Sequence, residues 1–250
     1  MASQPRGPAL MVSRPVAAQP VVAAWLALVA GAVNGIGVAA TGRDTSHVSG
    51  VTTSVMGHLM HGRGNAAMLG IALVASFLSG AVGCGLFIAI REGRPETGTL
   101  RSLLIVEGIL VASAGLALAA CGRGGGAEFA AVLLLAFAMG QQNATSSALL
   151  GDQVRTTHVT GMVTDLGREI GHLVFDVAGG TRRDGPRRTD EVRLAKSGSL
   201  FAGFILGALA GASVLLWWGE AGFFVVAAAP VAAALLVRAD ASETTEWSPP

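Results

Sequence analysis

Charge is scarce in this chain. Of its 250 residues, 13% are Asp, Glu, Lys or Arg, whereas 52% are hydrophobic, and the mean hydropathy is +0.59. A soluble domain carries about 25% charged residues. Several apolar runs also reach a length of about 20 residues, which is enough to cross a bilayer as a helix. The composition therefore excludes an ordinary soluble domain and predicts a membrane protein with several spans.

Several chemical signatures are missing as well. The two cysteines, Cys84 and Cys121, lie in or at the end of apolar segments, so no disulfide framework is indicated. The sequence contains no phosphate-binding loop, no Gly-x-Ser-x-Gly nucleophile elbow and no His-Glu-x-x-His zinc motif. The net charge is +1, and no basic patch is interleaved with aromatics. We therefore predict no cofactor and no nucleic-acid partner.

The apolar segments predict six spans arranged in two membrane halves. The spans cover about 21–40, 66–90, 102–120, 129–149, 199–218 and 221–237. The first half extends over 20–121 and the second over 127–238, and the second contains a basic cytoplasmic loop at 178–197. Residues 1–19 are expected to form a disordered cytoplasmic tail and residues 239–250 a polar tail. Most Arg and Lys residues then lie on the side of both termini, which predicts that both termini are cytoplasmic.

Two polar stretches related to each other interrupt the apolar pattern. Residues 45–53 read TSHVSGVTT and residues 155–167 read RTTHVTGMVTDLG, so both place hydroxyl residues before His-Val and a Ser/Thr-Gly pair after it. All five histidines lie in or just after these stretches. Each predicted half has three spans, an odd number, so the second half enters the membrane in the inverted orientation. Inverted 3+3 halves place their site at the membrane midplane, where interrupted helices meet. If each stretch spans the membrane itself, the chain has eight helices and parallel halves.

The Ser/Thr-Gly pairs are candidates for breaks in the helices. Gly50 and Gly161 would interrupt a helix and leave backbone groups lining a cavity. The alternative is an ordinary helix start with Ser49 or Thr160 as the N-cap. Thr53 and Thr164 follow three residues after the glycines and belong to the same candidate pathway.

Four ionisable residues are candidates for ion coupling. Asp165 is expected either to complement the helix dipole or to accept a proton or cation, with Arg155 and Arg168 as partners. Glu107 lies inside the third predicted span, where a carboxylate is a functional candidate by default, although pairing or snorkelling would also explain it. His47 and His158 occupy equivalent positions and titrate in the physiological range, or they bond to a backbone carbonyl.

The remaining histidines give no metal prediction. The pairs His58-x-x-His61 and Glu169-x-x-His172 place two potential ligands on one helix face, but the partner carboxylates of a di-metal bundle are missing.

Amide side chains lie deep in the apolar segments that precede the motifs. They are Asn34 in the first half and Gln141, Gln142 and Asn143 in the second. Inside lipid such groups must find partners. They are expected either to bond between helices or to line a polar pathway to the motifs.

Small residues recur every four positions on corresponding spans of the two halves. They are Ser76, Gly80 and Cys84 on the second span, and Gly203, Gly207 and Gly211 on the fifth. This spacing predicts closely packed helices.

The motifs resemble those of the YoaK family of bacterial membrane proteins, also known as domain of unknown function 1275. The resemblance covers about residues 20–240 and rests on GAVN at 31–34, HVSG at 47–50, AMGQQN at 138–143 and VRTTHVTGxxTDLG at 154–167. The first motif departs from the family pattern, which usually reads Thr-Gly-Asn where this chain has Ser49-Gly50-Val51. The resemblance implies a small protein of the bacterial inner membrane and no settled substrate.

The sequence thus predicts an all-α polytopic bundle with membrane lipid around it. The leading hypothesis is a secondary transporter or permease for a small polar solute, with proton coupling as an option. The second is a non-catalytic scaffold or accessory subunit whose polar residues only hold helices together. A membrane-embedded enzyme acting on lipid or quinone is a minor third, and a homo-oligomer stays open.

Overall fold

The fold is known from a computed structural model, which describes residues 20–94, 96–150, 156–178 and 187–237. The predicted tails at 1–19 and 239–250, Arg155 and residues 179–186 of the basic loop lie outside these ranges. Every regular element within them is a helix. The helices are α1 Pro20–Thr41, α2 Val48–Met60, α3 Gly64–Ile90, α4 Glu96–Cys121, α5 Gly125–Leu150, α6 Val159–Val177, α7 Arg187–Trp218, the 3₁₀ turn η1 Gly219–Ala221 and α8 Gly222–Leu236.

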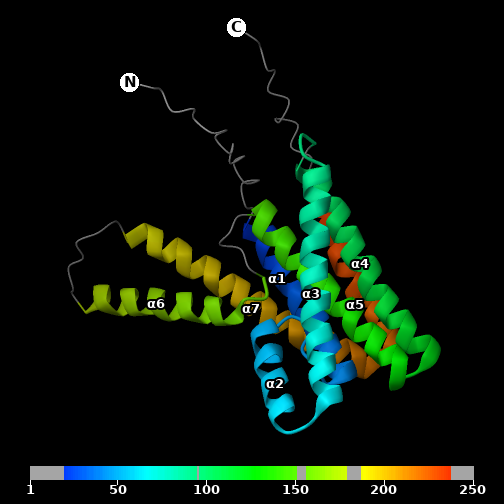
Figure 1. The fold of residues 1–250 in the computed structure, drawn as a ribbon. Coiled ribbons are helices and arrows are strands. Elements are labelled where there is room, and N and C mark those ends of the chain that lie inside the picture. The colour runs from blue at the N-terminus through cyan, green and yellow to red at the C-terminus, as the bar shows by residue number, and fades with distance from the viewer. Residues whose placement is uncertain (1–19, 95, 151–155, 179–186, 238–250) are drawn as a thin grey trace, which may run out of the picture.

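Six of the described helices form a bundle, and α2 and α6 project from it. Figure 1 shows α2 beside the lower end of α3, and α6 running alongside the first part of α7 away from the bundle. Four stretches are long and apolar enough to cross a membrane: Val22–Thr41, Gly64–Ile90, Glu96–Cys121 and Val192–Leu235. The last of these includes both the body of α7 and α8. Helix α5 is not among them, because its C-terminal half is rich in amides and hydroxyls.

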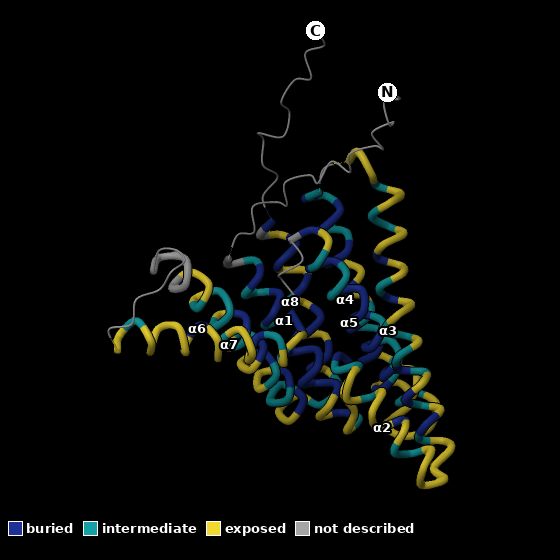
Figure 2. Tube along the Cα trace, turned by 60° about the vertical axis from the view of Figure 1, so that its left-hand side comes forward, coloured by how far each residue is buried: buried dark blue, intermediate teal, exposed yellow. Residues whose placement is uncertain are grey.

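The distribution of apolar side chains fits a lipid environment. Figure 2 shows that α1 is largely buried inside the bundle, whereas exposed residues recur along α3. Leu78, Leu86 and Ile90 of α3 are each at least 60% exposed. A water-soluble monomer rarely exposes such a surface, so these side chains face lipid. The prediction of an all-helical membrane protein is confirmed at this level.

Helices α1 and α7 approach until their backbones touch. A Cβ atom on Gly31 would overlap the Phe204 carbonyl oxygen, and one on Gly207 would overlap the Leu28 carbonyl oxygen. The contacts advance in the same direction along both helices, so α1 and α7 are parallel. Glycine permits this approach because it has no side chain between the backbones.

Helices α3 and α5 repeat this arrangement in detail. A Cβ atom on Gly140 would overlap the Phe77 carbonyl oxygen, and one on Gly80 would overlap the Phe137 carbonyl oxygen. In both pairs, each glycine lies three residues after the residue whose carbonyl meets the glycine of the partner helix. Ser76 adds a hydrogen bond from its Oγ to the Leu133 carbonyl, at 2.7 Å. The predicted role of the small-residue spacing is thus confirmed on both helices.

We predict that Gly140→Ala destabilises the protein by about 1–3 kcal/mol, because the added methyl group pushes α3 away from α5. The measurement is thermal unfolding in detergent. Gly85→Ala is the matched control, since Gly85 lies on α3, the partner helix, and a methyl group there would meet open space. Equal melting temperatures for the two variants would contradict the contact.

Candidate functional site

The first motif is held by a single buried amide on α1. The Asn34 Oδ1 atom accepts hydrogen bonds from the Thr45 backbone N–H at 3.3 Å, the Thr45 hydroxyl at 3.3 Å and the Ser46 hydroxyl at 3.0 Å. Helix α1 continues seven residues beyond Asn34, to Thr41, before the chain turns. Seven helical residues span about 10 Å. The segment after α1 therefore folds back along that helix before α2 begins.

The second motif repeats this anchor on α5. The Asn143 Oδ1 atom accepts a hydrogen bond from the Thr157 hydroxyl at 2.7 Å, and Thr156 beside it is completely buried. Helix α5 again continues seven residues beyond its anchoring amide, to Leu150. Asn34 and Asn143 therefore have the same structural role, because each binds hydroxyl groups that precede a histidine and ties them to the helix before the motif. Asn34 binds two such hydroxyls and Asn143 binds one, whereas the Thr156 hydroxyl has no partner among the described residues.

The predicted helix breaks at Gly50 and Gly161 are wrong. Helix α2 begins at Val48 and α6 at Val159, so both glycines lie in a first helical turn. The N-cap residues are His47 and His158, and neither makes a side-chain capping bond. The alternative prediction of Ser49 or Thr160 as N-cap is therefore also wrong. The non-helical backbone lies upstream, because the amide anchors compete there for the polar groups of the loop.

The hydroxyl residues within the motif helices are satisfied locally. Thr53 donates to the Ser49 carbonyl at 3.0 Å, and Thr164 donates to the Thr160 carbonyl at 2.8 Å. These bonds within one helix add no contact between elements. Thr160 and Thr164 nevertheless line the pocket of the second motif, described below.

His47 joins the first motif to α7. Its Nδ1 atom lies 3.2 Å from Asp44 Oδ1, and its ring centroid lies 5.8 Å from that of Phe204. The hydrogen bond from His47 lowers the pKa of Asp44 below its ordinary value; partial burial opposes this effect, and the bond from Asn34 adds to it. Asp44 is not among the predicted site residues, although it directly precedes the motif.

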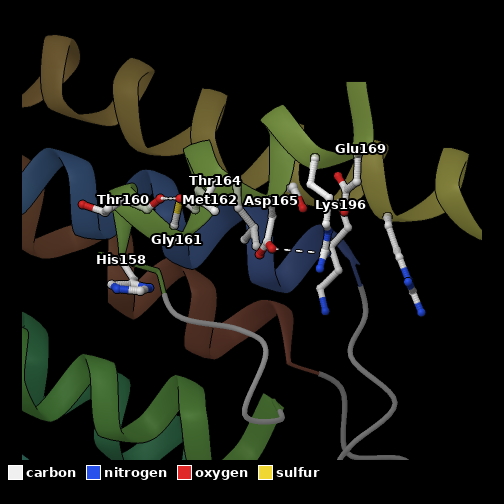
Figure 3. Close-up of a pocket in the computed structure, with 12 residues that line it drawn as sticks. His158, Thr160, Gly161, Met162, Thr164, Asp165, Glu169 and Lys196 are labelled. Carbon is white, nitrogen blue, oxygen red and sulfur yellow. Dashed lines mark hydrogen bonds and ion pairs between the residues drawn. The ribbon is translucent and has the colours of Figure 1, made fainter. Parts of the chain in front are cut away.

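A pocket of about 640 Å³ opens between α6 and the first part of α7. His158 lies at one end of it, with its ring against Gly161, where a Cβ atom would overlap Nδ1. Figure 3 shows His158 at one end of the lining and Asp165, Glu169 and Lys196 near one another toward the other end. The lining residues are His158, Thr160, Gly161, Met162, Thr164, Asp165, Arg168, Glu169, Arg193, Lys196, Ser197 and Leu200.

The charges around this pocket are unevenly paired. Asp165 Oδ1 lies 3.2 Å from Arg168 Nη2, and both side chains are more than half exposed. The predicted partnership with Arg168 is thus confirmed. Arg193 and Lys196 make no ion pair among the described residues, and Glu169 is buried with Oε2 lacking a hydrogen-bond partner there. Among the described residues, the pocket therefore presents two cations without an ion-pair partner and one enclosed carboxylate to a ligand.

A separate polar cluster lies inside the bundle. Gln141 donates from Nε2 to the Leu103 carbonyl of α4 at 2.8 Å, and Gln142 donates to the Leu26 carbonyl of α1 at 3.1 Å. The Oε1 atoms of both amides have no partner in the described structure. Glu107 of α4 is 0% exposed, and neither of its carboxyl oxygens has one. Gln141 and Gln142 thus form hydrogen bonds between helices, which is one of the two predicted roles. Their Oε1 atoms have no hydrogen-bond donor among the described residues.

The predicted site residues fall into four groups. His158, Thr160, Gly161, Thr164 and Asp165 gather at the pocket. Residues 47–53 do not line it, and Ser49, Gly50 and Thr53 face outward on α2. The interior group is Glu107, Gln141 and Gln142, while the anchors are Asn34 and Asn143.

Sequence reasoning misses the pocket residues Glu169, Arg193 and Lys196 as site members. Arg193 and Lys196 belong to the predicted basic loop, yet they lie on α7, seven and four residues before Leu200. This spacing places them on one helix face and is the signal that could have identified them.

These features define an all-helical integral membrane protein with polar segments folded back against its bundle. Residues 22–237 match the family described as "Protein of unknown function (DUF1275)", and the chain belongs to it. Comparison with curated proteins finds no match, and comparison with solved structures finds none either.

We predict that Asn34→Leu destabilises the protein by about 2 kcal/mol or more, because it leaves the buried polar groups of Thr45 and Ser46 without their acceptor. Chemical denaturation monitored by tryptophan fluorescence measures this loss. Thr53→Val is the control and should change stability by less than about 0.5 kcal/mol, since Thr53 is exposed. Similar losses in the two variants would exclude Asn34 as the anchor.

The interaction between Asp44 and His47 should depend on pH. Because folding lowers the pKa of Asp44, its ionised form contributes stability above the ordinary aspartate pKa of about 3.9, and this contribution is lost as the pH falls further. We therefore expect the parent to have a higher melting temperature than Asp44→Asn at pH 7 and at pH 5. The difference between the two melting temperatures should shrink below about pH 4. A difference that grows on acidification would refute the assignment.

Proposed function

We propose that this protein is a secondary transporter for a small polar solute. The observation that carries the proposal is the pair of folded-back segments, each tied by an amide to the helix before it. Irregular backbone at membrane depth is tolerated where protein or a cavity surrounds it. Interrupted segments of this kind, repeated in two halves, are typical of secondary transporters.

The helix directions support two inverted halves of three spans each. Helix α1 is parallel to α7, and α3 is parallel to α5. Gly108 meets Ala227, whereas Gly115 further along α4 meets Phe223, so α4 is antiparallel to α8. With the short turns between successive helices, α1, α4 and α7 run one way and α3, α5 and α8 run the other. Helix α5 therefore starts the second half in the direction opposite to α1.

The proposed solute carries negative charge. It occupies the pocket between α6 and α7, where Arg193 and Lys196 make no ion pair with a described residue and the exposed hydroxyl of Thr160 is a further donor. Glu169 and Asp165 bring negative charge to the same pocket. An anion that also bears an ammonium group, such as an amino acid, matches both signs.

The proposed location is the bacterial inner membrane, with both termini in the cytoplasm. Support comes from the excess of Arg and Lys on that side of the predicted spans. Arg91 and Arg94 follow α3 at the same end of the bundle at which α1 begins and α8 ends.

A non-catalytic scaffold is the second candidate, and one observation favours it. The acceptor of Asn34 is fully used by Thr45 and Ser46, and residues 47–53 line no part of the described pocket. Side chains that satisfy one another hold helices together without binding a solute. On this hypothesis the first motif is purely structural.

Uptake by proteoliposomes tests the proposal. The probes are labelled phosphate, succinate and glutamate, which represent an inorganic anion, a dicarboxylate and an amino acid. For the probe that is transported, Lys196→Gln should raise the half-saturating concentration about tenfold, as expected when one charge-assisted hydrogen bond is lost. For phosphate and succinate, Asp165→Asn should lower it about two- to threefold, because it removes a negative charge of an exposed pair beside the pocket. For glutamate the same substitution should raise it, because the ammonium group of this probe loses a negative partner.

Glu92→Gln serves as the control, since Glu92 is an exposed carboxylate after the end of α3. His158→Ala should also weaken uptake, because the His158 ring forms one end of the pocket. If all three probes stay outside folded proteoliposomes, or if Lys196→Gln and Asp165→Asn shift the half-saturating concentration of phosphate or succinate in the same direction, the anion transporter is rejected and the scaffold is favoured.

A further inference from the structure

Glu107 is the most isolated ionisable group of the described bundle. Its side chain is fully buried on α4, and both carboxyl oxygens lack a hydrogen-bond partner there. Moving a carboxylate out of water without a partner costs several kcal/mol. The group avoids this cost only as a neutral acid, which holds a proton.

No described charge near Glu107 could replace that proton. Helix α4 packs against α5, α8 and the turn η1. On α4 itself, Arg101 donates to the Val237 carbonyl, and Glu96 lies in the first turn. The only charged residue of α5 is Glu128 in its first turn, α8 has none, and Glu220 of η1 pairs with Arg123.

Buried polar groups lead from Glu107 toward one end of the bundle. Gln141 bonds to the carbonyl of Leu103, one turn before Glu107, and Thr145 lies one turn beyond Gln141 on α5. The Thr145 hydroxyl is 3.3 Å from Cys84 Sγ. Because α4 and α5 are antiparallel, Thr99 lies further toward the same end, where Arg91 donates to its hydroxyl at 3.3 Å.

Toward the other end, the buried side chains of α4 and α5 are apolar. On α4 they include Val111, Ala114 and Leu118. On α5 they include Leu135 and Val132. A proton on Glu107 therefore has polar neighbours on one side only, namely the side of the short turn between α3 and α4.

We propose that Glu107 is a proton-binding site and that Gln141 and Thr145 connect it to the end of the bundle where α4 begins. Its role in coupling rests on the proposed function: the anion enters the cell together with the proton that Glu107 carries. The proton would reach Glu107 from, or leave it toward, the proposed cytoplasmic end. The binding of the proton itself does not depend on transport.

Carbodiimide labelling of the full-length protein in liposomes tests the site without any solute. Dicyclohexylcarbodiimide enters lipid and adds to protonated carboxyl groups. At neutral pH we expect an adduct on Glu107, located by mass spectrometry, and no adduct on the exposed Glu92. Glu107→Gln should abolish it and Glu92→Gln should not. An unlabelled Glu107, or an adduct blocked by Na⁺ at constant pH, would overturn the proposal in favour of an ionised or metal-binding carboxylate.

Two further measurements separate a proton site from a structural carboxylate. Glu107→Gln should remove the infrared band of a protonated carboxylic acid while its melting temperature stays close to that of the parent, since an amide imitates a neutral acid in shape. Gln141→Leu should slow deuterium exchange of that band about tenfold, as the loss of one hydrogen-bonded step implies. A band unchanged in Glu107→Gln would refute the assignment.

The coupling role has its own readout. With an inward proton gradient, the parent should accumulate the transported probe, whereas Glu107→Gln should only equilibrate it. Accumulation by Glu107→Gln equal to that of the parent would overturn the coupling role. If no probe is transported at all, the proposed function fails, whereas the labelling and infrared results still decide the proton site.

Discussion

The close contact of helix backbones at glycine is the constraint on which the rest of this structure depends. Inside lipid there is little hydrophobic force between helices, so close packing and interhelical hydrogen bonds must supply the association. Here Gly31 and Gly207 bring α1 onto α7, and Gly80 and Gly140 bring α3 onto α5. With these two pairs fixed, the positions of the anchors Asn34 and Asn143 follow, because each lies three residues after a contact glycine.

The anchors explain how polar chain segments are tolerated against the bundle. Each segment folds back toward the amide that lies about two turns before the end of the preceding helix. Hydroxyl groups of the segment donate hydrogen bonds to that amide. The backbone is thereby freed from helix geometry over a few residues and regains it at His47 or His158. The two halves differ after that point. Helix α2 stays beside α3, whereas α6 extends away from the bundle with α7 and leaves a pocket between them.

Much of the fold can be predicted from the sequence, because lipid imposes a simple rule on helix length and polarity. The boundaries of α1, α3 and α8 follow their apolar runs closely. The start of α7 cannot be predicted in this way, since its first turns are charged and extend twelve residues before the apolar segment that begins at 199. The positions at which the helices are interrupted also cannot be predicted from the sequence pattern. Glycine next to Ser or Thr suggests them, but the tertiary bonds of Asn34 and Asn143 decide where the helix stops.

The candidate site shows the same limit. The pattern indicates Asp165 and Glu107 as comparable candidates, yet their surroundings differ entirely. Asp165 is exposed and paired with Arg168, whereas Glu107 is enclosed and alone. Burial depends on which helices meet, and a single sequence does not record that. Lys196 likewise falls in a predicted loop, because its helix carries too much charge there to resemble a span.

Helix α7 is one uninterrupted rod that serves two places at once. Its first part forms a wall of the pocket, and its middle is pinned to α1 at Gly203, Gly207 and Gly211. A wall of the pocket and the contact surface for α1 therefore belong to a single helix. A shift of α7 along or about its axis would alter both at once, so α7 cannot reshape the pocket independently of its contact with α1.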